Sequence, residues 1–122
     1  LGLDDVEILT GRAENLAHDL ALRGEFDLVI SRAVAKLPVL AELTLAFATL
    51  GGFVAAYKGK EIETELRESC SAIRIMGGVL KEVKSVKLQG EQRITSIVAL
   101  DKIQLTPEEY PRRPGIPFKR PL

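Results

Sequence analysis

The sequence predicts an α/β layered fold that is parallel at first and closed by an antiparallel hairpin. Two observations predict it. Short, nearly continuous apolar runs alternate with segments of helical spacing from residue 6 to residue 76. Two longer β-rich runs, residues 79–88 and 93–100, then follow with only a short polar stretch between them, which is typical of a hairpin.

The expected elements follow one another at short intervals. A β-branched stretch at residues 6–10 ends at Gly11, and a helix fits from Ala13 to about residue 22, where Gly24 stops it. Residues 26–30 read FDLVI, a run typical of a strand covered on both faces. The remaining elements are a helix from Pro38 to the glycine pair 51–52, a strand at residues 53–57, and a helix at residues 61–76.

The end of the chain has a different composition. Five prolines between residues 107 and 121 predict an extended, polyproline-like tail without regular structure. We find no internal repeat and no linker between domains. The sequence therefore predicts an α/β unit at residues 1–104 and an extended basic tail of the same domain at residues 105–122.

Composition excludes several classes of protein. Of the 122 residues, 46% are hydrophobic and 28% are charged, as in an ordinary globular domain. No apolar run approaches the roughly 20 residues that span a membrane, so we expect no membrane partner. The single cysteine allows no internal disulfide and favours the cytoplasm. No Cys/His cluster has the spacing of metal ligands, so we expect no metal.

Polar residues gather where the expected strands end. These groups are residues 10–14, residues 31–33 and residues 58–60. In an open parallel sheet, ligands bind at the carboxyl ends of the strands, so the three groups mark a candidate site. The alternative is that loops after strands are polar in any such fold.

Longer strings carry a family resemblance. GRAENL, FDLVISRAVAKLPVLAEL, GGFVAAYKG and TPEEYPRRPGIPFKRPL occur in order along nearly the whole chain. They resemble the RsmG (glucose-inhibited division protein B) family. The resemblance implies a Rossmann-like class I methyltransferase fold that transfers a methyl group from S-adenosylmethionine to N7 of a guanine in 16S rRNA. It makes residues 1–104 the C-terminal part of the methyltransferase α/β domain, and 16S rRNA or a small ribosomal subunit particle the partner.

The resemblance also assigns roles to single residues. It implies that Ala13 and Glu14 contact the adenosine part of the cofactor and that Arg32 lines the cofactor or active-site pocket. Alternatively, Arg32 only pairs with a carboxylate, and Glu14 only favours the start of a helix. Lys58 stands where the family keeps a Lys-Gly pair, which we place near the RNA or the methyl-transfer site. The charge of the tail, and not the resemblance, makes Arg112, Arg113, Lys119 and Arg120 candidates for contact with RNA phosphates.

Two departures from the family pattern matter. The glycine-rich loop after the first strand and the acidic residue that ends the second strand are missing. We therefore expect a gap of two strands in the sheet, and a chain that is inactive by itself. Glu108 and Glu109 stand where relatives tend to carry lysine, which weakens the expected attraction of the tail for phosphate.

The expected chemistry needs no catalytic acid or base. Guanine N7 has a lone pair and no proton, so catalysis reduces to holding donor and acceptor in line. Three alternatives stay open: a non-catalytic RNA-binding remnant, an incomplete sequence of an intact enzyme, and a nucleotide-binding oxidoreductase. The missing glycine fingerprint and the closing hairpin count against the oxidoreductase.

Overall fold

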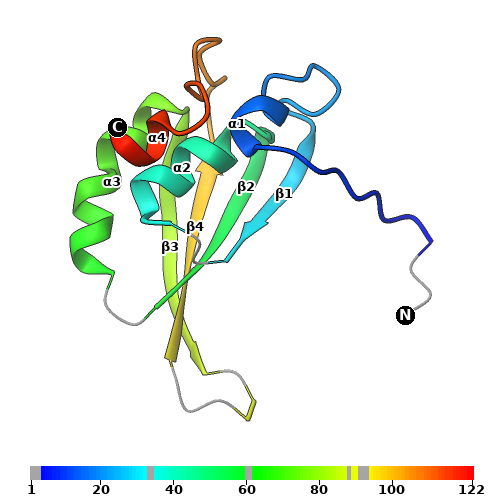
Figure 1. The fold of residues 1–122 in the computed structure, drawn as a ribbon. Coiled ribbons are helices and arrows are strands. Elements are labelled where there is room, and N and C mark those ends of the chain that lie inside the picture. Colours follow the sequence, from blue (N-terminus) through cyan, green and yellow to red (C-terminus); the bar gives the residue numbers. More distant parts are fainter. Residues whose placement is uncertain (1–3, 33–34, 60–61, 88, 91–93) are drawn as a thin grey trace.

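A computed structural model describes residues 4–32, 35–59, 62–87, 89–90 and 94–122 (Figure 1). It contains four helices and four strands in these residues. In chain order the elements are α1 (Ala13–Leu16), β1 (Phe26–Ser31), α2 (Leu37–Leu45), β2 (Ala48–Lys58), α3 (Glu63–Ile75), β3 (Gly78–Lys87), β4 (Ile94–Lys102) and α4 (Ile116–Lys119).

The four strands form one mixed sheet in the order β1-β2-β4-β3. β1 and β2 are parallel, whereas β4 runs antiparallel to both β2 and β3. The predicted α/β fold with a closing hairpin is therefore confirmed. β1 lies at the edge of this sheet. Because β1 is paired with β2 and runs parallel to it, the carboxyl ends of the two strands are neighbours.

The core lies between the sheet and the helices. α2 packs against α3 and against β2, and α3 packs against β3 (Figure 1). Alternate residues of β2 are buried, as expected for a strand with one face against helices. The largest buried side chains of this core are Leu37, Leu40, Leu45, Val54, Met76, Val98 and Leu100.

The strand expected at residues 6–10 is not formed. These residues have no regular structure, and their side chains are exposed. A strand needs a neighbour that satisfies its backbone N–H and C=O groups, and β1 pairs with β2 alone among the described strands. The apolar, β-branched composition of residues 6–10 is therefore not sufficient to form a strand.

The helix expected from Ala13 to residue 22 is a single turn, α1, followed by turns. Asp19 lies in these turns, and its side-chain Oδ1 accepts a hydrogen bond from the Ala21 N–H at 2.9 Å. Aspartate that bonds nearby backbone in this way competes with the helix.

The second helix and the strand after it meet earlier than expected. α2 ends at Leu45, and β2 begins at Ala48 and includes Gly51 and Gly52. Gly51 has φ of +84°, and a Cβ on Gly52 would lie 2.7 Å from the carbonyl oxygen of Asp27. The two glycines therefore allow close contact between β1 and β2 instead of ending the helix.

The C-terminal segment differs from the expected tail without regular structure. It contains the short helix α4, and both Pro111 and Pro117 are fully buried. Arg23 holds the start of this segment, because its guanidinium donates hydrogen bonds to the carbonyl oxygens of Thr106, Pro107 and Tyr110 at 2.8–3.1 Å. Residues 105–122 are thus packed onto the α/β unit.

Candidate functional site

The carboxyl ends of β1 and β2 lie side by side, because Ser31 pairs with Ala56 in the parallel ladder. Arg32 follows β1 directly and is exposed. Lys58 ends β2, and its side chain is only 8% exposed. The carboxyl ends of these two strands therefore carry one exposed cation, Arg32, and one buried cation, Lys58. Two other residues of the predicted polar groups, Ala33 and Lys60, lie outside the described residues.

Lys58 is fully engaged with its neighbours. Its Nζ donates a hydrogen bond to the Ala35 carbonyl at 2.7 Å and forms an ion pair with Oε1 of Glu65 at 3.1 Å. The same carboxylate oxygen accepts a hydrogen bond from the Leu37 N–H at 3.0 Å. These contacts connect the end of β2, the first turn of α3 and the start of α2.

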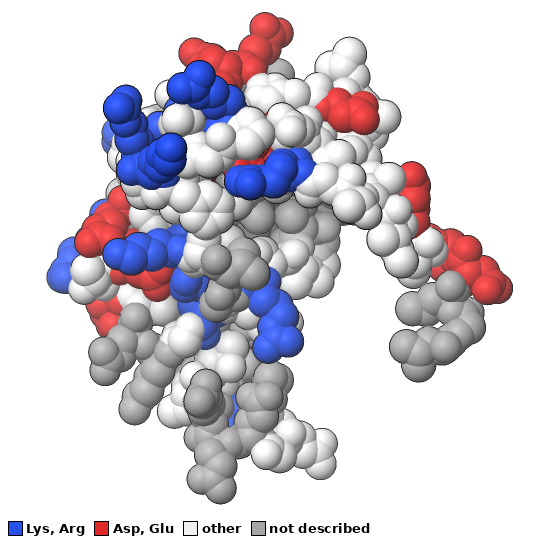
Figure 2. Space-filling model, in the orientation of Figure 1, with Lys and Arg blue, Asp and Glu red and all other residues white. Residues whose placement is uncertain are grey.

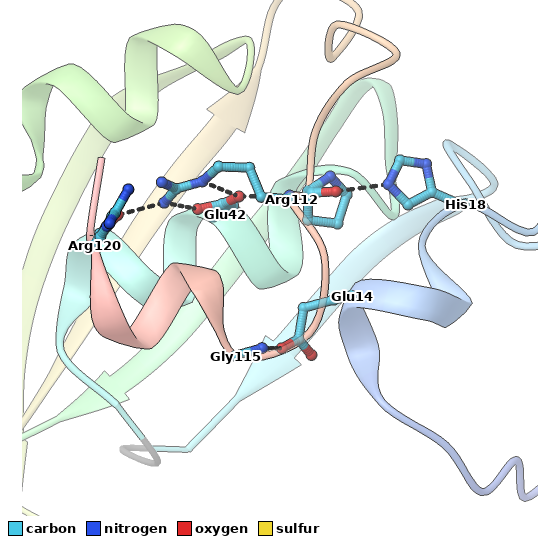
Figure 3. A network of polar contacts seen from close by, with 7 residues as sticks. Glu14, His18, Glu42, Arg112, Gly115 and Arg120 are labelled. Carbon is cyan, nitrogen blue, oxygen red and sulfur yellow. Dashed lines mark hydrogen bonds and ion pairs between the residues drawn. The ribbon is translucent and has the colours of Figure 1, made fainter.

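Glu14 is the buried acidic residue of α1, with only 2% of its side chain exposed. Its Oε2 accepts a hydrogen bond from Nη2 of Arg12 at 2.9 Å. The same oxygen accepts one from the Gly115 N–H at 3.0 Å (Figure 3). Burial raises the pKa of the Glu14 carboxyl, but the bonds from Arg12 and the backbone outweigh burial and leave that pKa lowered. The charged carboxylate thus joins α1 to the C-terminal segment.

A second carboxylate binds the same segment. Glu42 of α2 is completely buried, and Arg112 contacts both of its oxygens, with Nη2 2.8 Å from Oε1 and Nε 3.1 Å from Oε2 (Figure 3). The hydrogen bond with Glu42 raises the pKa of Arg112. Close by, Nε2 of His18 lies 2.6 Å from the Pro111 carbonyl oxygen and can donate a hydrogen bond to it.

The other basic residues of the C-terminal segment face solvent. Arg113, Lys119 and Arg120 are all exposed. Figure 2 shows Lys and Arg side chains gathered on the part of the surface that holds the C-terminus and α4 in Figure 1. This part of the surface can attract phosphate groups, whereas the guanidinium of Arg112 already pairs with Glu42.

An open apolar groove of about 270 Å³ lies beside β1. Leu9 and Leu16, on either side of Ala13 and Glu14, contribute to its lining. Ile30, two residues before Arg32, also lines it. The groove therefore borders both stretches to which the resemblance assigns the cofactor, and it could accept a flat apolar ring.

The predicted site residues fall into separate groups. Glu14 and Arg112 take part in contacts that hold the C-terminal segment to α1 and α2, whereas Arg32 and Lys58 lie at the ends of β1 and β2. Among the contacts of the described residues, none joins Arg32 to Glu14 or to Lys58.

Sequence reasoning missed three residues that organise this region: Arg23, Glu42 and Glu65. One signal was present for Glu42, an acidic residue within the apolar run LPVLAELTL, because a charge on such a helix needs a buried partner. Besides the nearby Ala17 carbonyl, Arg23 donates to three backbone carbonyls more than 80 residues away, which no local pattern reveals.

Neither a membrane-spanning helix nor a metal cluster occurs in the described part of the chain. None of its helices has the length and apolar character needed to cross a membrane. No group of three or more His, Cys, Asp or Glu side chains in it is arranged to hold a metal ion.

Comparison with known proteins identifies the family. The family model described as GidB, rRNA small subunit methyltransferase G, matches residues 1–95. Proteins named ribosomal RNA small subunit methyltransferase G from Brevibacillus brevis and Moorella thermoacetica are 44% and 45% identical over all 122 residues. A protein of the same name from Dehalococcoides mccartyi is 47% identical. The chain covers 51%, 51% and 52% of these three proteins.

One solved structure is similar at a lower level. It is the T. thermophilus 16S rRNA N2 G1207 methyltransferase (RsmC) in complex with AdoMet and guanosine, with a TM-score of 0.44 and 18% identity. The similarity covers 70% of this chain and 22% of that protein.

The chain spans about half the length of the curated relatives it matches. On the family match over residues 1–95, the chain belongs to the rRNA small subunit methyltransferase G (GidB) family.

Proposed function

We propose that this chain forms part of an enzyme that transfers the methyl group of S-adenosylmethionine to N7 of a guanine in 16S rRNA. The observation that carries the proposal is the match over all 122 residues to relatives named ribosomal RNA small subunit methyltransferase G. Because the chain spans about half of those relatives, the complete reaction requires residues beyond the matched half.

The groove beside β1 supports the cofactor assignment. Its apolar lining suits the adenine ring, and it includes Leu16 of α1, the helix that also carries Ala13 and Glu14. The carboxylate of Glu14 is occupied by Arg12 and Gly115, so Glu14 would contact the cofactor through its backbone. Arg32 is exposed at the end of β1, where its guanidinium can bind a polar group of the cofactor.

The residues of this chain would orient the reactants and would not transfer protons. Bound S-adenosylmethionine supplies an electrophilic methyl group on a sulfonium. Guanine N7 would attack with its own lone pair as the bond between the methyl carbon and sulfur breaks and S-adenosylhomocysteine leaves, so no general base is required. The contribution of Arg32 and the groove is then to hold the donor in line with N7 at short range.

The exposed basic residues of the C-terminal segment support an RNA partner, either 16S rRNA or a small ribosomal subunit particle. We propose phosphate contacts for Arg113, Lys119 and Arg120. The RNA roles expected for Lys58 and Arg112 stay predictions, because each has its charge paired with a glutamate. An enzyme with this substrate would act in the cytoplasm.

Reconstitution tests the proposal. We would fuse the unmatched half of the Brevibacillus brevis relative to this chain and measure transfer of labelled methyl from S-adenosylmethionine to 16S rRNA and to small subunits. Chemical cleavage at 7-methylguanine would then locate the product. We expect transfer, reduced at least about tenfold by Arg32→Ala, the size of one lost charge-assisted hydrogen bond.

Arg74→Ala, an exposed arginine at the end of α3, is the matched control and should retain full activity. RNA binding without methyl transfer in the fused protein would favour the alternative, a non-catalytic RNA-binding remnant. An equal loss of methyl transfer in Arg32→Ala and Arg74→Ala would show that Arg32 has no specific role in binding the cofactor.

A further inference from the structure

Three elements meet at one carboxylate near the expected cofactor site. Oε1 of Glu65, in the first turn of α3, accepts a hydrogen bond from the Leu37 N–H at 3.0 Å and pairs with Nζ of Lys58 at 3.1 Å. Lys58 in turn donates to the Ala35 carbonyl at 2.7 Å. Glu65 is 20% exposed and Lys58 only 8% exposed, so both contacts are largely shielded from water and screened less by salt.

Described residues are held on both sides of Arg32 in the chain. Ser31 before it is held in the ladder with β2, and Ala35 and Leu37 after it are held by Lys58 and Glu65. Arg32 lies only three residues from Ala35, a separation that the backbone spans with about 10 Å at most. The two anchors therefore limit where the Arg32 side chain can begin.

The same contacts leave Lys58 little to offer an RNA phosphate. Its charge is paired with Glu65, and its ammonium group is buried between that carboxylate and a carbonyl oxygen. To reach a phosphate, Lys58 would have to leave this ion pair. The largely buried Glu65 carboxylate would then lose its cation, and this cost would reduce any gain from binding RNA.

We infer that Glu65 and Lys58 are positioning residues that hold Ala35 and Leu37 at the entry to α2 so that Arg32 can bind the cofactor. The inference rests on the proposed function for Arg32 and adds two residues that act through it. Neither residue touches the cofactor or the RNA. Their loss should change cofactor affinity and leave the affinity for RNA unchanged.

The first measurement is amide hydrogen exchange on the 122-residue chain. Glu65→Ala removes the acceptor of the Leu37 N–H, so exchange of that amide should become about tenfold faster. Glu65→Gln keeps an acceptor and should recover most of the protection. Glu68→Ala, an exposed glutamate on the same helix, is the matched control and should leave Leu37 unchanged. Unchanged exchange in Glu65→Ala would overturn the inference.

The second measurement uses the fused methyltransferase described above. Lys58→Met and Glu65→Ala should each raise the KM for S-adenosylmethionine about tenfold, with a smaller change in kcat. The Kd for 16S rRNA and its salt dependence should stay as in the wild-type protein. Lys84→Met, an exposed lysine of β3, serves as the control for loss of charge.

Each contrary result has a distinct meaning. A salt slope for RNA binding that falls by about one in Lys58→Met, with an unchanged KM for the cofactor, would make Lys58 an RNA contact and overturn the inference. If the wild-type fusion transfers no methyl group, the proposed function fails and the positioning role falls with it. The exchange rates would still decide whether Glu65 holds the segment.

Discussion

Arg112 and Glu42 form a bidentate ion pair between the C-terminal segment and α2. Besides the two guanidinium contacts, the Arg112 N–H donates to Oε2 of Glu42 at 2.7 Å, and Nη2 of Arg112 also donates to the Arg120 carbonyl at 2.6 Å. Glu42 is completely buried, so it depends on Arg112 for charge compensation. Arg112 therefore tethers the segment in which it lies.

Removal of Arg112 should destabilise the fold much more than removal of its neighbour. In Arg112→Ala the buried charge of Glu42 loses its partner, and we expect the free energy of unfolding to fall by about 3 kcal/mol. Arg113→Ala removes an exposed arginine and should cost less than about 0.5 kcal/mol. Urea unfolding of the two variants measures the difference, and equal losses would show that the ion pair does not stabilise the fold.

The contact between Glu14 and Gly115 should weaken in acid. Because the pKa of Glu14 is lowered in the folded state, its charge contributes stability that is fully present above its ordinary value of 4.5. That stability is lost as the pH falls through the folded pKa. Glu14→Gln cannot titrate, so the stability advantage of the wild-type protein over this variant should shrink between pH 7 and pH 3. A constant difference in unfolding free energy over that range would contradict this explanation.

The sequence was sufficient for elements that depend on local pattern. The FDLVI run, the β-rich hairpin and the helix ended by Gly77 all have the expected type, because apolar spacing and glycine act over a few residues. The expectation that the FDLVI strand is covered on both faces was wrong, because β1 lies at the edge of the sheet and most of its residues are exposed. The stretch at residues 6–10 has a similar composition but no strand beside it. Local pattern therefore predicts a strand only where the sheet provides a partner.

In the candidate site too, some features follow from the order of elements in the sequence, whereas others depend on the packed fold. The ends of β1 and β2, and with them Arg32 and Lys58, follow from the chain order of parallel strands. The pairing of Lys58 with Glu65 depends on how α3 packs, and that of Glu14 with Gly115 joins residues 101 positions apart. Such long-range contacts arise from the packed fold, so the sequence alone predicted charges at the site without their partners.

Lys102 should make the fold more stable in mild alkali. Its side chain is buried and donates to the Leu45 and Ala48 carbonyls and to Thr106, with no carboxylate among these partners. Burial, and to a lesser degree the charge of Arg23, lowers the pKa of Lys102 from 10.5 to about 8. Between these two values the unfolded chain binds more protons, so stability rises with pH, by up to about 3 kcal/mol.

The Lys102→Met variant isolates this effect. Methionine does not titrate, so the unfolding free energy of the wild-type protein should rise relative to the variant between pH 8 and pH 10.5. Titration of the remaining groups is common to both proteins and cancels in the difference. Parallel pH profiles would show that Lys102 has an ordinary pKa in the folded state.

Gly77 should tolerate no side chain. It joins α3 to β3 with φ of +89°, and its carbonyl accepts hydrogen bonds from the Ile103 and Gln104 N–H groups. A Cβ at this position would lie 2.1 Å from the Gln104 carbonyl oxygen, so the residues after β4 would have to move away from Gly77.

Gly90→Ala is the matched control for Gly77→Ala. Gly90 has a similar φ of +83°, but no described atom lies within 4 Å of the position that a Cβ would take there, so alanine introduces only the backbone strain of about 1 kcal/mol. Gly77→Ala adds a backbone collision to the same strain and should cost at least about 2 kcal/mol more. Thermal unfolding of both variants separates the two contributions. Equal melting temperatures would mean that the residues after β4 move aside without loss, and that the close contact between Gly77 and Gln104 does not hold the C-terminal segment in place.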